Sequence, residues 1–331
     1  MKILNVPPVL DDDGVLSLLR DLNQNINIPE VSINFKTLEW VRPFGTLVFA
    51  EGLKDFIKKR KENNLHTYYL DIDWLKKKSS GPISYLKYFG FFQYCGMRCG
   101  DFPNRGHHTN RYFPITIITK EHLENESFLG NWRNSIERKC EELAQLVTMD
   151  YIAHDYLEYS FREIIRNVFE HSRTESCSIM AQCYSDDEIE IAVADRGVGI
   201  HKTLVDKFKT NDPLESLFIA LEPGVSCVDI ERSKGQWGNS GFGLYILSGV
   251  GKEYGTFSIL SSGAYLSLYK EDKKTVVDSL YYAGTAVKIT VKKALLEYFP
   301  NLKKNLIDAG EVKYFDKYGK KIKASGKSKS S

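Results

Sequence analysis

The chain has 331 residues, of which 42% are hydrophobic and 27% charged, and its formal net charge is +2. This length and apolar content are enough for two ordinary domains, each with its own core. The balanced charge gives no field that would attract nucleic acid or a membrane surface, so neither is expected as a partner. No stretch approaches the roughly 20 apolar residues of a membrane-spanning helix.

The N-terminal stretch MKILNVPPVLDDDG contains three acidic residues and no long apolar core, which does not fit a signal peptide. The six cysteines are scattered, and most have apolar neighbours, so we interpret them as reduced thiols of a cytoplasmic protein. Cys95 and Cys99 lie near His107 and His108 in the sequence. A four-residue spacing without a second Cys pair is poor for zinc, and packing thiols are the favoured interpretation.

The first 100 residues alternate between strand patterns and helix patterns. Strands are expected at Lys2–Val6, Val31–Phe35 and Leu65–Leu70, and helices from about Asp12, over Phe44–Lys59 and over Ile83–Phe92. The alternation predicts a small α/β domain over residues 1–100.

Residues 101–150 are expected to form a linker and a connector helix. Residues 101–110 have the Pro, Gly and Asn content of a linker. Arg111–Thr119 reads as a strand, or as an arm that packs on the second domain. Trp132–Val147 has helical spacing, and the sequence leaves open whether this helix connects domains or pairs with a second copy.

An amphipathic helix is expected over Asp155–Ser172, with its apolar residues at helical spacing. Glu163, Asn167 and His171 are four residues apart, so they project from one polar face, each one turn from the next. A carboxylate, a carboxamide and an imidazole in this arrangement could hold a water and a metal-bound anion. Taken alone, the pattern is better explained by a solvated helix face.

The rest of the chain completes a second domain, predicted over residues 151–296. Strands are expected at Cys177–Tyr184, Glu188–Ala194, Thr256–Ser261, Ala264–Lys270 and Thr285–Lys292, and helices at Pro213–Leu221 and Ser240–Glu253. The polar, glycine-bearing segment Glu222–Asn239 is long enough to indicate a lid. Residues 297–331 are expected to form a basic, partly disordered tail, with low complexity over 324–331.

Two glycine-rich segments suggest a binding site for a flat ring and a phosphate chain. Asp195-Arg196-Gly197-Val198-Gly199 follows a strand, where the carboxylate could accept from an exocyclic amine and the glycines would admit a ring. An ordinary tight turn is the alternative. The second segment, GNSGFGL at residues 238–244, precedes a helix, where exposed backbone N–H groups suit phosphate. A capped helix N-terminus is the alternative, although two glycines inside a helix would cost about 1 kcal/mol each.

Together, these three segments resemble the boxes of the GHKL ATPase superfamily, which includes histidine kinases, DNA gyrase, mismatch-repair ATPases and heat-shock chaperones. The order matches: Glu-x-x-x-Asn on a helix, Asp-x-Gly-x-Gly, and a glycine-rich box after a lid, with Gly284-Thr285 opening a late strand. The resemblance covers residues 155–294. It implies the Bergerat fold, an α/β sandwich with a mixed sheet and ATP bound on its helical side.

The resemblance assigns roles to matching positions. Asn167 would ligate Mg²⁺, and Glu163 would be the general base that orients a water or hydroxyl at the terminal phosphate. Asp195 would bond the adenine amine, and Thr285 would support the adenine side. The remaining cofactor-binding positions that it implies are Gly197 and Gly199 beside the ring, and Gly238, Gly241, Gly243 and Leu244 in the phosphate box. Lys234 in the lid would pair with phosphate, or would be a solvated loop charge. His171 is interpreted as bracing the helix end.

The N-terminal domain resembles a STAS domain, the fold of anti-sigma-factor antagonists. Asn34 stands at the strand end, Gly45 follows at the family's distance, and Gly90 matches a further family glycine. The loop Arg42-Pro43-Phe44 lacks the Ser or Thr that the family phosphorylates. This departure indicates a binding module rather than a phosphorylated switch.

The resemblance implies two alternative functions in signalling. The chain is too short for the middle domains of gyrase or chaperones, and His154-Asp155 does not fit a phospho-accepting helix. What remains is a regulator that binds Mg-ATP, as an ATPase or Ser/Thr protein kinase of the anti-sigma-factor kinase type acting on a partner protein. The alternative is a non-catalytic interaction module gated by ATP. Whether the chain forms a homodimer is left open.

Overall fold

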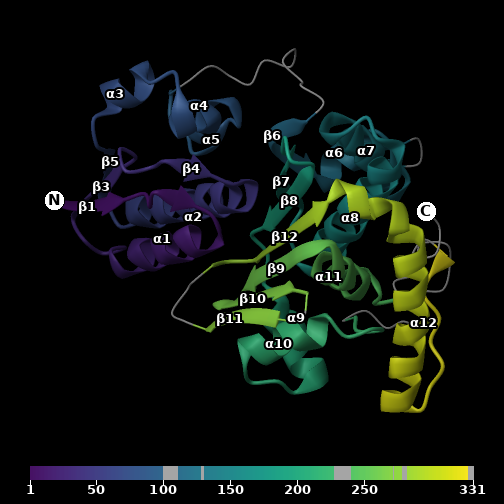
Figure 1. Cartoon of the computed structure of the whole chain (residues 1–331). Coiled ribbons are helices and arrows are strands. Elements are labelled where there is room, and N and C mark those ends of the chain that lie inside the picture. The colour runs from purple at the N-terminus through teal and green to yellow at the C-terminus, as the bar shows by residue number, and fades with distance from the viewer. Residues whose placement is uncertain (100–110, 128–129, 227–239, 271, 278–281, 327–331) are drawn as a thin grey trace.

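The computed structural model describes residues 1–99, 111–127, 130–226, 240–270, 272–277 and 282–326. Its fold is a mixed α/β architecture, with two units that lie side by side (Figure 1). The N-terminal unit contains a parallel sheet in the order β1-β3-β5 and a short parallel pair, β2-β4. The second unit is built on a seven-stranded sheet.

The N-terminal unit follows the strand–helix alternation of its sequence. Its elements are β1 (Lys2–Asn5), β2 (Val9–Leu10), α1 (Asp12–Gln24), β3 (Glu30–Asn34), β4 (Trp40–Val41), α2 (Pro43–Glu62), β5 (His66–Tyr69), α3 (Ile72–Lys77), α4 (Gly81–Tyr88) and α5 (Phe91–Tyr94). The Asp11 side chain caps α1 by accepting from the Gly14 backbone N–H. Pro43 stands in the first turn of α2, where its missing N–H is not needed.

The large sheet has the strand order β11-β10-β9-β12-β8-β7-β6. Its strands are β6 (Tyr112–Thr119), β7 (Ser176–Cys183), β8 (Glu188–Asp195), β9 (Gly255–Ser261), β10 (Ala264–Tyr269), β11 (Asp272–Val277) and β12 (Thr285–Lys292). All of these neighbouring strands pair antiparallel, so the expectation of a mixed sheet is wrong. The long crossover does make β8 and β9 parallel to each other, but β12 inserts between them and runs antiparallel to both.

Helices cover one face of this sheet. They are α6 (Lys120–Asn125), α7 (Trp132–Val147), α8 (Tyr151–His171), α9 (Ile200–Phe208), α10 (Pro213–Ala220) and α11 (Gly243–Tyr254). α8 and α11 lie against the sheet, and α7 packs on α8. β6 and α7 are therefore built into the second unit, where the sequence suggested a linker and connector.

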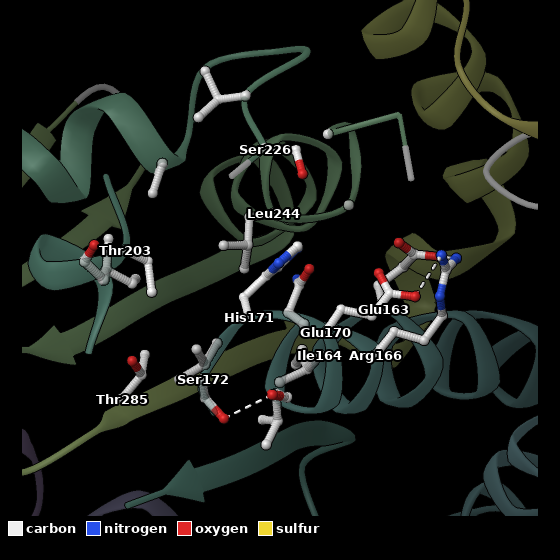
Figure 2. Close-up of a pocket in the computed structure, with 18 of the residues that line it drawn as sticks. Glu163, Ile164, Arg166, Glu170, His171, Ser172, Thr203, Ser226, Leu244 and Thr285 are labelled. Carbon is white, nitrogen blue, oxygen red and sulfur yellow. Dashed lines mark hydrogen bonds and ion pairs between the residues drawn. The ribbon is translucent and has the colours of Figure 1, made fainter. Parts of the chain in front are cut away.

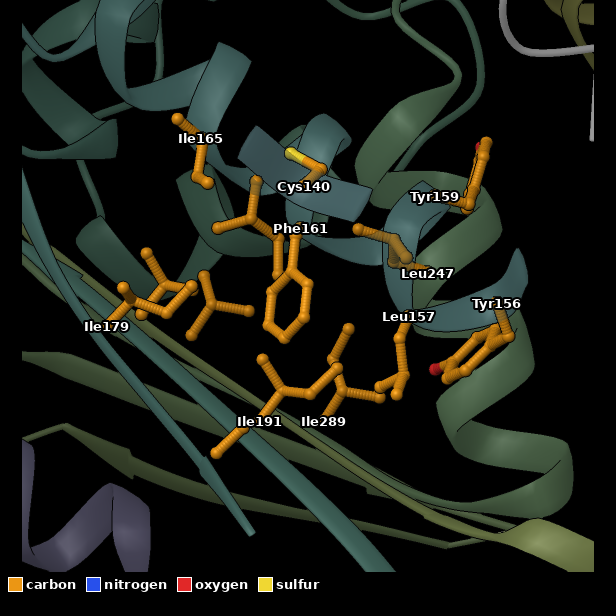
Figure 3. Packing of buried hydrophobic residues seen from close by; sticks show 14 of the residues in the cluster. Cys140, Tyr156, Leu157, Tyr159, Phe161, Ile165, Ile179, Ile191, Leu247 and Ile289 are labelled. Atoms are coloured by element: carbon orange, nitrogen blue, oxygen red, sulfur yellow. The ribbon is translucent and has the colours of Figure 1, made fainter. Parts of the chain in front are cut away.

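The core between helices and sheet is centred on Phe161 of α8. Figure 3 shows its ring among Ile179, Ile191 and Ile289 from three neighbouring strands, with Leu247 of α11 alongside. The strand side chains alternate between the two faces, so every second residue of β8 points into this core. Because the apolar side of α8 is packed against the sheet in this core, the orientation of its polar face is fixed.

The other face of the large sheet is covered by the N-terminal unit. Met180, Ala192, Ala194 and Ala286 belong to the same buried cluster as the core of that unit. These mostly small side chains let α2 pack closely on β7 and β8. The molecule thus has helices on one face of the sheet and a second domain on the opposite face (Figure 1).

A long C-terminal helix takes the place of much of the expected tail. α12 (Phe299–Tyr318) follows a 3-10 turn at Lys293–Tyr298 and packs along α11. Beyond it, Ala324 is buried in the main core, and its backbone N–H donates to Glu311. Residues 297–326 are therefore an ordered covering of the second unit, and low complexity over 324–331 did not predict the burial of Ala324.

Candidate functional site

The helix that carries the predicted metal and base positions starts earlier than its apolar pattern indicates. α8 begins at Tyr151, because the Asp150 carboxylate caps it by accepting from the backbone N–H of Ile152 (3.0 Å) and of Ala153 (3.2 Å). The extra turn adds Ala153 to the buried face. The predicted polar face is preserved and borders a cavity.

Glu163, Asn167 and His171 all line this cavity, which lies between the helices and the sheet. Glu163 is buried, and burial lowers the pKa of His171. The Asn167 Nδ2 is also buried, and among the described residues it has no hydrogen-bond acceptor. An amide donor left without a partner costs free energy, so a ligand that accepts from it would be stabilised.

Asp195 enters the cavity from the end of β8. Its carboxylate accepts from the Gly197 backbone N–H at 2.7 Å, and the residue is only 4% exposed. Burial raises the pKa of Asp195 to about 7, against the lowering effect of backbone hydrogen bonds from Gly197 and Thr285. The group is therefore a buried acceptor with few partners of its own, as a site for an exocyclic amine requires.

Thr285 reaches the same cavity because the start of β12 runs directly beside Asp195. A Cβ on Gly284 would meet the Asp195 carbonyl oxygen at 2.1 Å, and Gly284 has a φ of +95°. Only glycine fits that close approach. The Thr285 hydroxyl is 3.1 Å from the Ser261 hydroxyl, which also accepts from the Ile200 backbone N–H.

The two glycines after Asp195 have different surroundings. Gly199 lines the cavity with a φ of +79°, where any side chain would be strained. Gly197 does not line it: a Cβ there would meet the Ser172 carbonyl oxygen at 2.1 Å, and the neighbouring Val198 N–H donates to that oxygen. Gly197 therefore joins the turn to the end of α8, whereas the sequence placed it beside a ring.

The glycine-rich segment before α11 forms the opposite wall. Gly241 and Gly243 both line the cavity, together with Leu244. A Cβ on Gly241 would lie 2.6 Å from the Gly224 backbone carbon, and one on Gly243 would lie 2.5 Å from the Glu163 Oε2. The N-cap residue of α11, Phe242, makes no side-chain cap hydrogen bond. A phenylalanine side chain cannot accept from the first N–H groups of α11, so an anion could bind them.

The cavity has two chemically distinct ends. Figure 2 shows Glu163 and Arg166 at one end and Thr285 at the other, with His171 and Leu244 between them. Its volume is about 100 Å³, below the roughly 300–1,000 Å³ of most ligand pockets. A nucleotide-sized ligand would have to widen it. Ser226 and Ser240, which border residues 227–239, both stand on its wall.

Two buried arginines beside Glu163 were missed in the sequence. The Glu163 Oε1 is 3.6 Å from the Arg162 Nε and 3.9 Å from the Arg166 Nη1, and Arg166 also pairs with Glu170 at 3.4 Å. Their spacing of one to four residues along one helix is the signal that could have revealed them. At this end of the cavity wall the Arg166 guanidinium is therefore paired with the carboxylates of Glu163 and Glu170.

The cavity brings together most of the predicted positions. Those on its wall are Glu163, Asn167, Asp195, Gly199, Gly241, Gly243, Leu244 and Thr285. Gly197 lies outside the lining, and Lys234 and Gly238 fall outside the described residues. Ser325 also lines the cavity, from the C-terminal segment, and nothing in the local sequence indicated this.

Other predicted features lie away from the cavity. Cys95 and Cys99 are buried in the core of the N-terminal unit, whereas His107 and His108 are outside the described residues. Within the described ranges, no three His, Cys, Asp or Glu side chains gather closely enough to hold a metal ion by themselves. None of the described helices has both the length and the apolar content to cross a membrane.

Comparison with known proteins adds no assignment. No protein-family model matches the chain, and no significant match is found among curated proteins.

Proposed function

We propose that this chain binds Mg-ATP in the cavity between α8, β8 and α11, and that it acts on a partner protein as an ATPase or Ser/Thr protein kinase. The observation that carries this proposal is convergence. The segments that resemble three GHKL boxes are far apart in the sequence, and seven of their predicted positions line one cavity, together with Thr285 of the late strand. The two ends of the cavity also differ chemically: one carries Glu163 and Arg166, where phosphates would lie, and the other carries Asp195 and Thr285, where the base would lie.

The residues present fit a magnesium ion shared with phosphate. Mg²⁺ is usually held by one or two side-chain oxygens together with waters and substrate phosphates, rather than by a cage of carboxylates. Asn167 would supply its amide oxygen, and its unpartnered Nδ2 could donate to a phosphate oxygen. When bound, the ion would neutralise charge on the phosphates.

The phosphate chain would lie against the start of α11. Gly241 and Gly243 let this segment pack closely on Gly224 and Glu163, and the helix N-terminus would present N–H groups to an anion. Arg166 adds positive charge at the same end of the cavity. At the other end, the Asp195 carboxylate would accept from the adenine amine, with Thr285 beside it.

Glu163 is the candidate general base. Its carboxylate lies one turn from Asn167, and its Oε2 faces the glycine loop, where a terminal phosphate would end. Arg162 and Arg166 hold the carboxylate in place. It could therefore accept a hydrogen bond from an attacking water or from a Ser or Thr hydroxyl and orient it for in-line attack.

A contact between the two units favours the second candidate, a non-catalytic module gated by ATP. Arg196, directly after Asp195, donates to the Glu51 carbonyl oxygen of α2 at 2.6 Å and pairs with Asp55. Nucleotide at Asp195 could thus alter how the N-terminal unit sits on the sheet, without any turnover.

The test separates binding from turnover. Isothermal titration of the full chain with Mg-ATP is expected to show binding that Asn167→Ala weakens at least tenfold, whereas Asn305→Ala on the exposed face of α12 does not. Unchanged affinity in Asn167→Ala would contradict the site. Phosphate release or transfer from labelled ATP should fall about 100-fold or more in Glu163→Gln, with Mg-ATP still bound. Binding without any turnover in the native chain would favour the gated module.

A further inference from the structure

A second cavity, of about 480 Å³, lies on the N-terminal unit where α4 meets β4 (Figure 1). This volume is within the range of pockets that bind small molecules. It lies on a different set of elements from the proposed nucleotide site, and its lining is unlike that site. The residues around it are Glu39, Trp40, Val41, Gly81, Pro82, Ser84, Tyr85, Tyr88 and Tyr184.

Helical spacing builds one wall of this cavity. Gly81, Ser84, Tyr85 and Tyr88 stand at positions i, i+3, i+4 and i+7 of α4, so they share one face of the helix. Trp40 and Val41 of β4 form the facing wall. Tyr184, just past the end of β7, closes the cavity from the second unit. Four aromatic side chains therefore converge from three separate parts of the chain.

Three of these aromatic side chains are unusually exposed. Trp40 is 55% exposed, Tyr85 43% and Tyr88 58%. Single exposed apolar residues are ordinary, but a group of large rings around one hollow marks a recognition site. The rings leave π-faces and edges in contact with water that a ligand could displace.

Two of the rings are held by contacts outside the cavity. The Tyr85 hydroxyl accepts from the Gln182 Nε2 at 2.9 Å, and its ring meets Phe89 edge-on at 5.0 Å. The Tyr184 ring lies under the Arg42 guanidinium, 4.9 Å from its centre. Rings fixed in this way lose little freedom when a ligand binds, which favours affinity.

The charge around the cavity favours a cation. Glu39 is the one charged side chain on its wall, and none of the described residues that line it is Lys, Arg or His. Glu39 forms no ion pair with any other described residue. The Arg42 charge behind Tyr184 is balanced by Glu188 and Glu190, which both pair with it. A cation in the cavity would thus be attracted by a carboxylate and would meet no opposing lysine or arginine on the wall.

We propose that this cavity binds a quaternary ammonium group, such as that of choline or trimethyl-lysine. Aromatic faces attract a cation through their quadrupoles, and methyl groups on that cation pack against the rings. A primary ammonium carries no methyl groups to pack against the rings, so it would lose that part of the attraction. The carboxylate of Glu39 supplies the counter-charge. The proposal is independent of nucleotide binding.

The experiment uses a ligand pair that differs in charge and hardly in shape. Choline and its neutral isostere 3,3-dimethyl-1-butanol are titrated into the full chain by calorimetry and by NMR. We expect choline to bind at least about tenfold more tightly, because the neutral compound keeps the methyl contacts and loses the cation–π attraction. Equal affinity for the two compounds, or no binding of choline, would overturn the proposal.

Variants locate the site and test its charge. Trp40→Leu and Tyr88→Leu keep apolar bulk and remove a π-face, and each should weaken choline binding about tenfold, whereas Glu39→Gln should weaken it severalfold. Tyr298→Leu, at a tyrosine 54% exposed elsewhere on the surface, is the matched control. Unchanged melting temperatures and Mg-ATP titrations show that the variants remain folded.

A peptide bearing trimethyl-lysine, compared with its unmethylated form, identifies the source of the cation. Tighter binding of the methylated peptide than of choline indicates a protein partner, and the reverse indicates a free metabolite. A proline-rich peptide is the competitor, since aromatic grooves also bind polyproline helices. If that peptide binds in a way that depends on Trp40 while choline does not bind, the proposal is wrong.

Discussion

Asp195 is a residue whose burial lowers the stability of the folded protein when its carboxyl group is ionised. Its carboxyl group is almost fully buried, and burial raises its pKa from 3.8 to about 7. A raised pKa in the folded state means that ionising the group costs folding free energy. The fold tolerates this cost at one end of the cavity, which is where an amine-accepting carboxylate would be needed.

Asp195→Asn is expected to stabilise the protein at pH 8 and to have little effect at pH 4. Below pH 4 the carboxyl is protonated in both states; as pH rises from about 4 to 7 the unfolded chain ionises while the folded one resists, so native stability falls. Asn removes this loss, on the order of 2–4 kcal/mol above pH 7. Its amide oxygen can still accept from Gly197.

Urea denaturation of both proteins at the two pH values measures this difference. Asp206→Asn, at an exposed position of α9, is the control and should behave alike at both. A stabilisation by Asp195→Asn that is equal at pH 4 and pH 8 would show that titration is not its source.

Much of the site could be predicted from the spacing of single residues. Helical spacing puts Glu163, Asn167 and His171 on one face, and the strand pattern puts Asp195 at a strand end; that the two meet in one site was implied by the motif resemblance. Gly197 shows the limit of that reasoning. Position 197 must be glycine because any larger residue would collide with the Ser172 carbonyl oxygen at the end of α8. The motif alone cannot reveal this tertiary contact.

At the scale of elements, α12 is the longest of the helices that sequence patterns did not predict. Its buried positions are Phe299, Lys303, Ile307 and Gly310. A lysine and a glycine among four buried positions leave no continuous apolar stripe, so periodicity gives no signal. α9 was missed for a similar reason, since Leu204 is its one buried residue. Longer helices with full stripes, such as α7 and α8, were predicted within a few residues of their bounds.

α12 supports the glycine-rich segment from behind. Gly310 lies so close to it that an added Cβ would be 2.8 Å from ring carbons of both Phe242 and Tyr245, and 3.1 Å from the Pro223 Cβ. Those two rings flank the first turn of α11. The position of α12 and the shape of the cavity wall formed by Gly241–Leu244 are therefore coupled through one glycine.

Gly310→Val is expected to destabilise the protein by about 1–3 kcal/mol, because the larger side chain overpacks this contact. It should also weaken Mg-ATP binding, since Phe242 must move and carries Gly241 and Gly243 with it. Thermal unfolding and calorimetric titration measure the two effects. Ala309→Val, on the neighbouring exposed position, should cost less than about 1 kcal/mol and leave affinity unchanged. Similar effects from both variants would rule out the contact as the cause.

For the whole molecule, the main arrangement that the sequence did not reveal is the N-terminal unit packed on the sheet. β8 alternates Ile189, Ile191 and Val193 with Glu190 and Ala192, and this reads as one buried and one solvent-facing side. In the structure both sides are buried, and Glu190 is fully covered by α2. The side of β8 that carries Glu190 and Ala192 has only small and charged residues, so the local sequence does not predict that another domain covers it.

A buried ion pair holds this interface. The Glu190 carboxylate accepts from the Arg42 Nε at 2.6 Å and from the Phe44 backbone N–H at 2.9 Å. The loop Arg42-Pro43-Phe44 is thus occupied by docking on the sheet. That the N-terminal unit is a binding module rather than a phosphorylated switch stays a prediction.

Arg42→Met should destabilise the protein by about 3–5 kcal/mol, because it leaves Glu190 buried and without its cation. Arg138→Met, which removes an exposed pair with Glu126, is the matched control and should cost less than about 1 kcal/mol. Denaturation followed by circular dichroism and by tryptophan fluorescence measures both. If Arg42→Met unfolds as easily as the control, the pair does not hold the units together.

The remaining contact across the interface links docking to the proposed nucleotide site. Arg196 stands between Asp195 and Gly197, and its guanidinium reaches Glu51 and Asp55 of α2. Any shift of the Asp195 turn on nucleotide binding must therefore act on α2. Binding at one site changes stability at the other by a coupling free energy that is the same in both directions.

Mg-ATP is accordingly expected to slow amide hydrogen exchange in α2 around residues 51–55, with opening at least about fivefold rarer. Arg196→Met should abolish this slowing while the chain still binds Mg-ATP, because the variant removes the link and leaves Asp195 and Asn167 in place. Exchange in α4, whose main contacts are with β4 and α5, serves as the internal reference. If α2 is protected equally in the native chain and in Arg196→Met, the coupling does not pass through Arg196; if nucleotide binds without protecting α2 at all, the two units act independently.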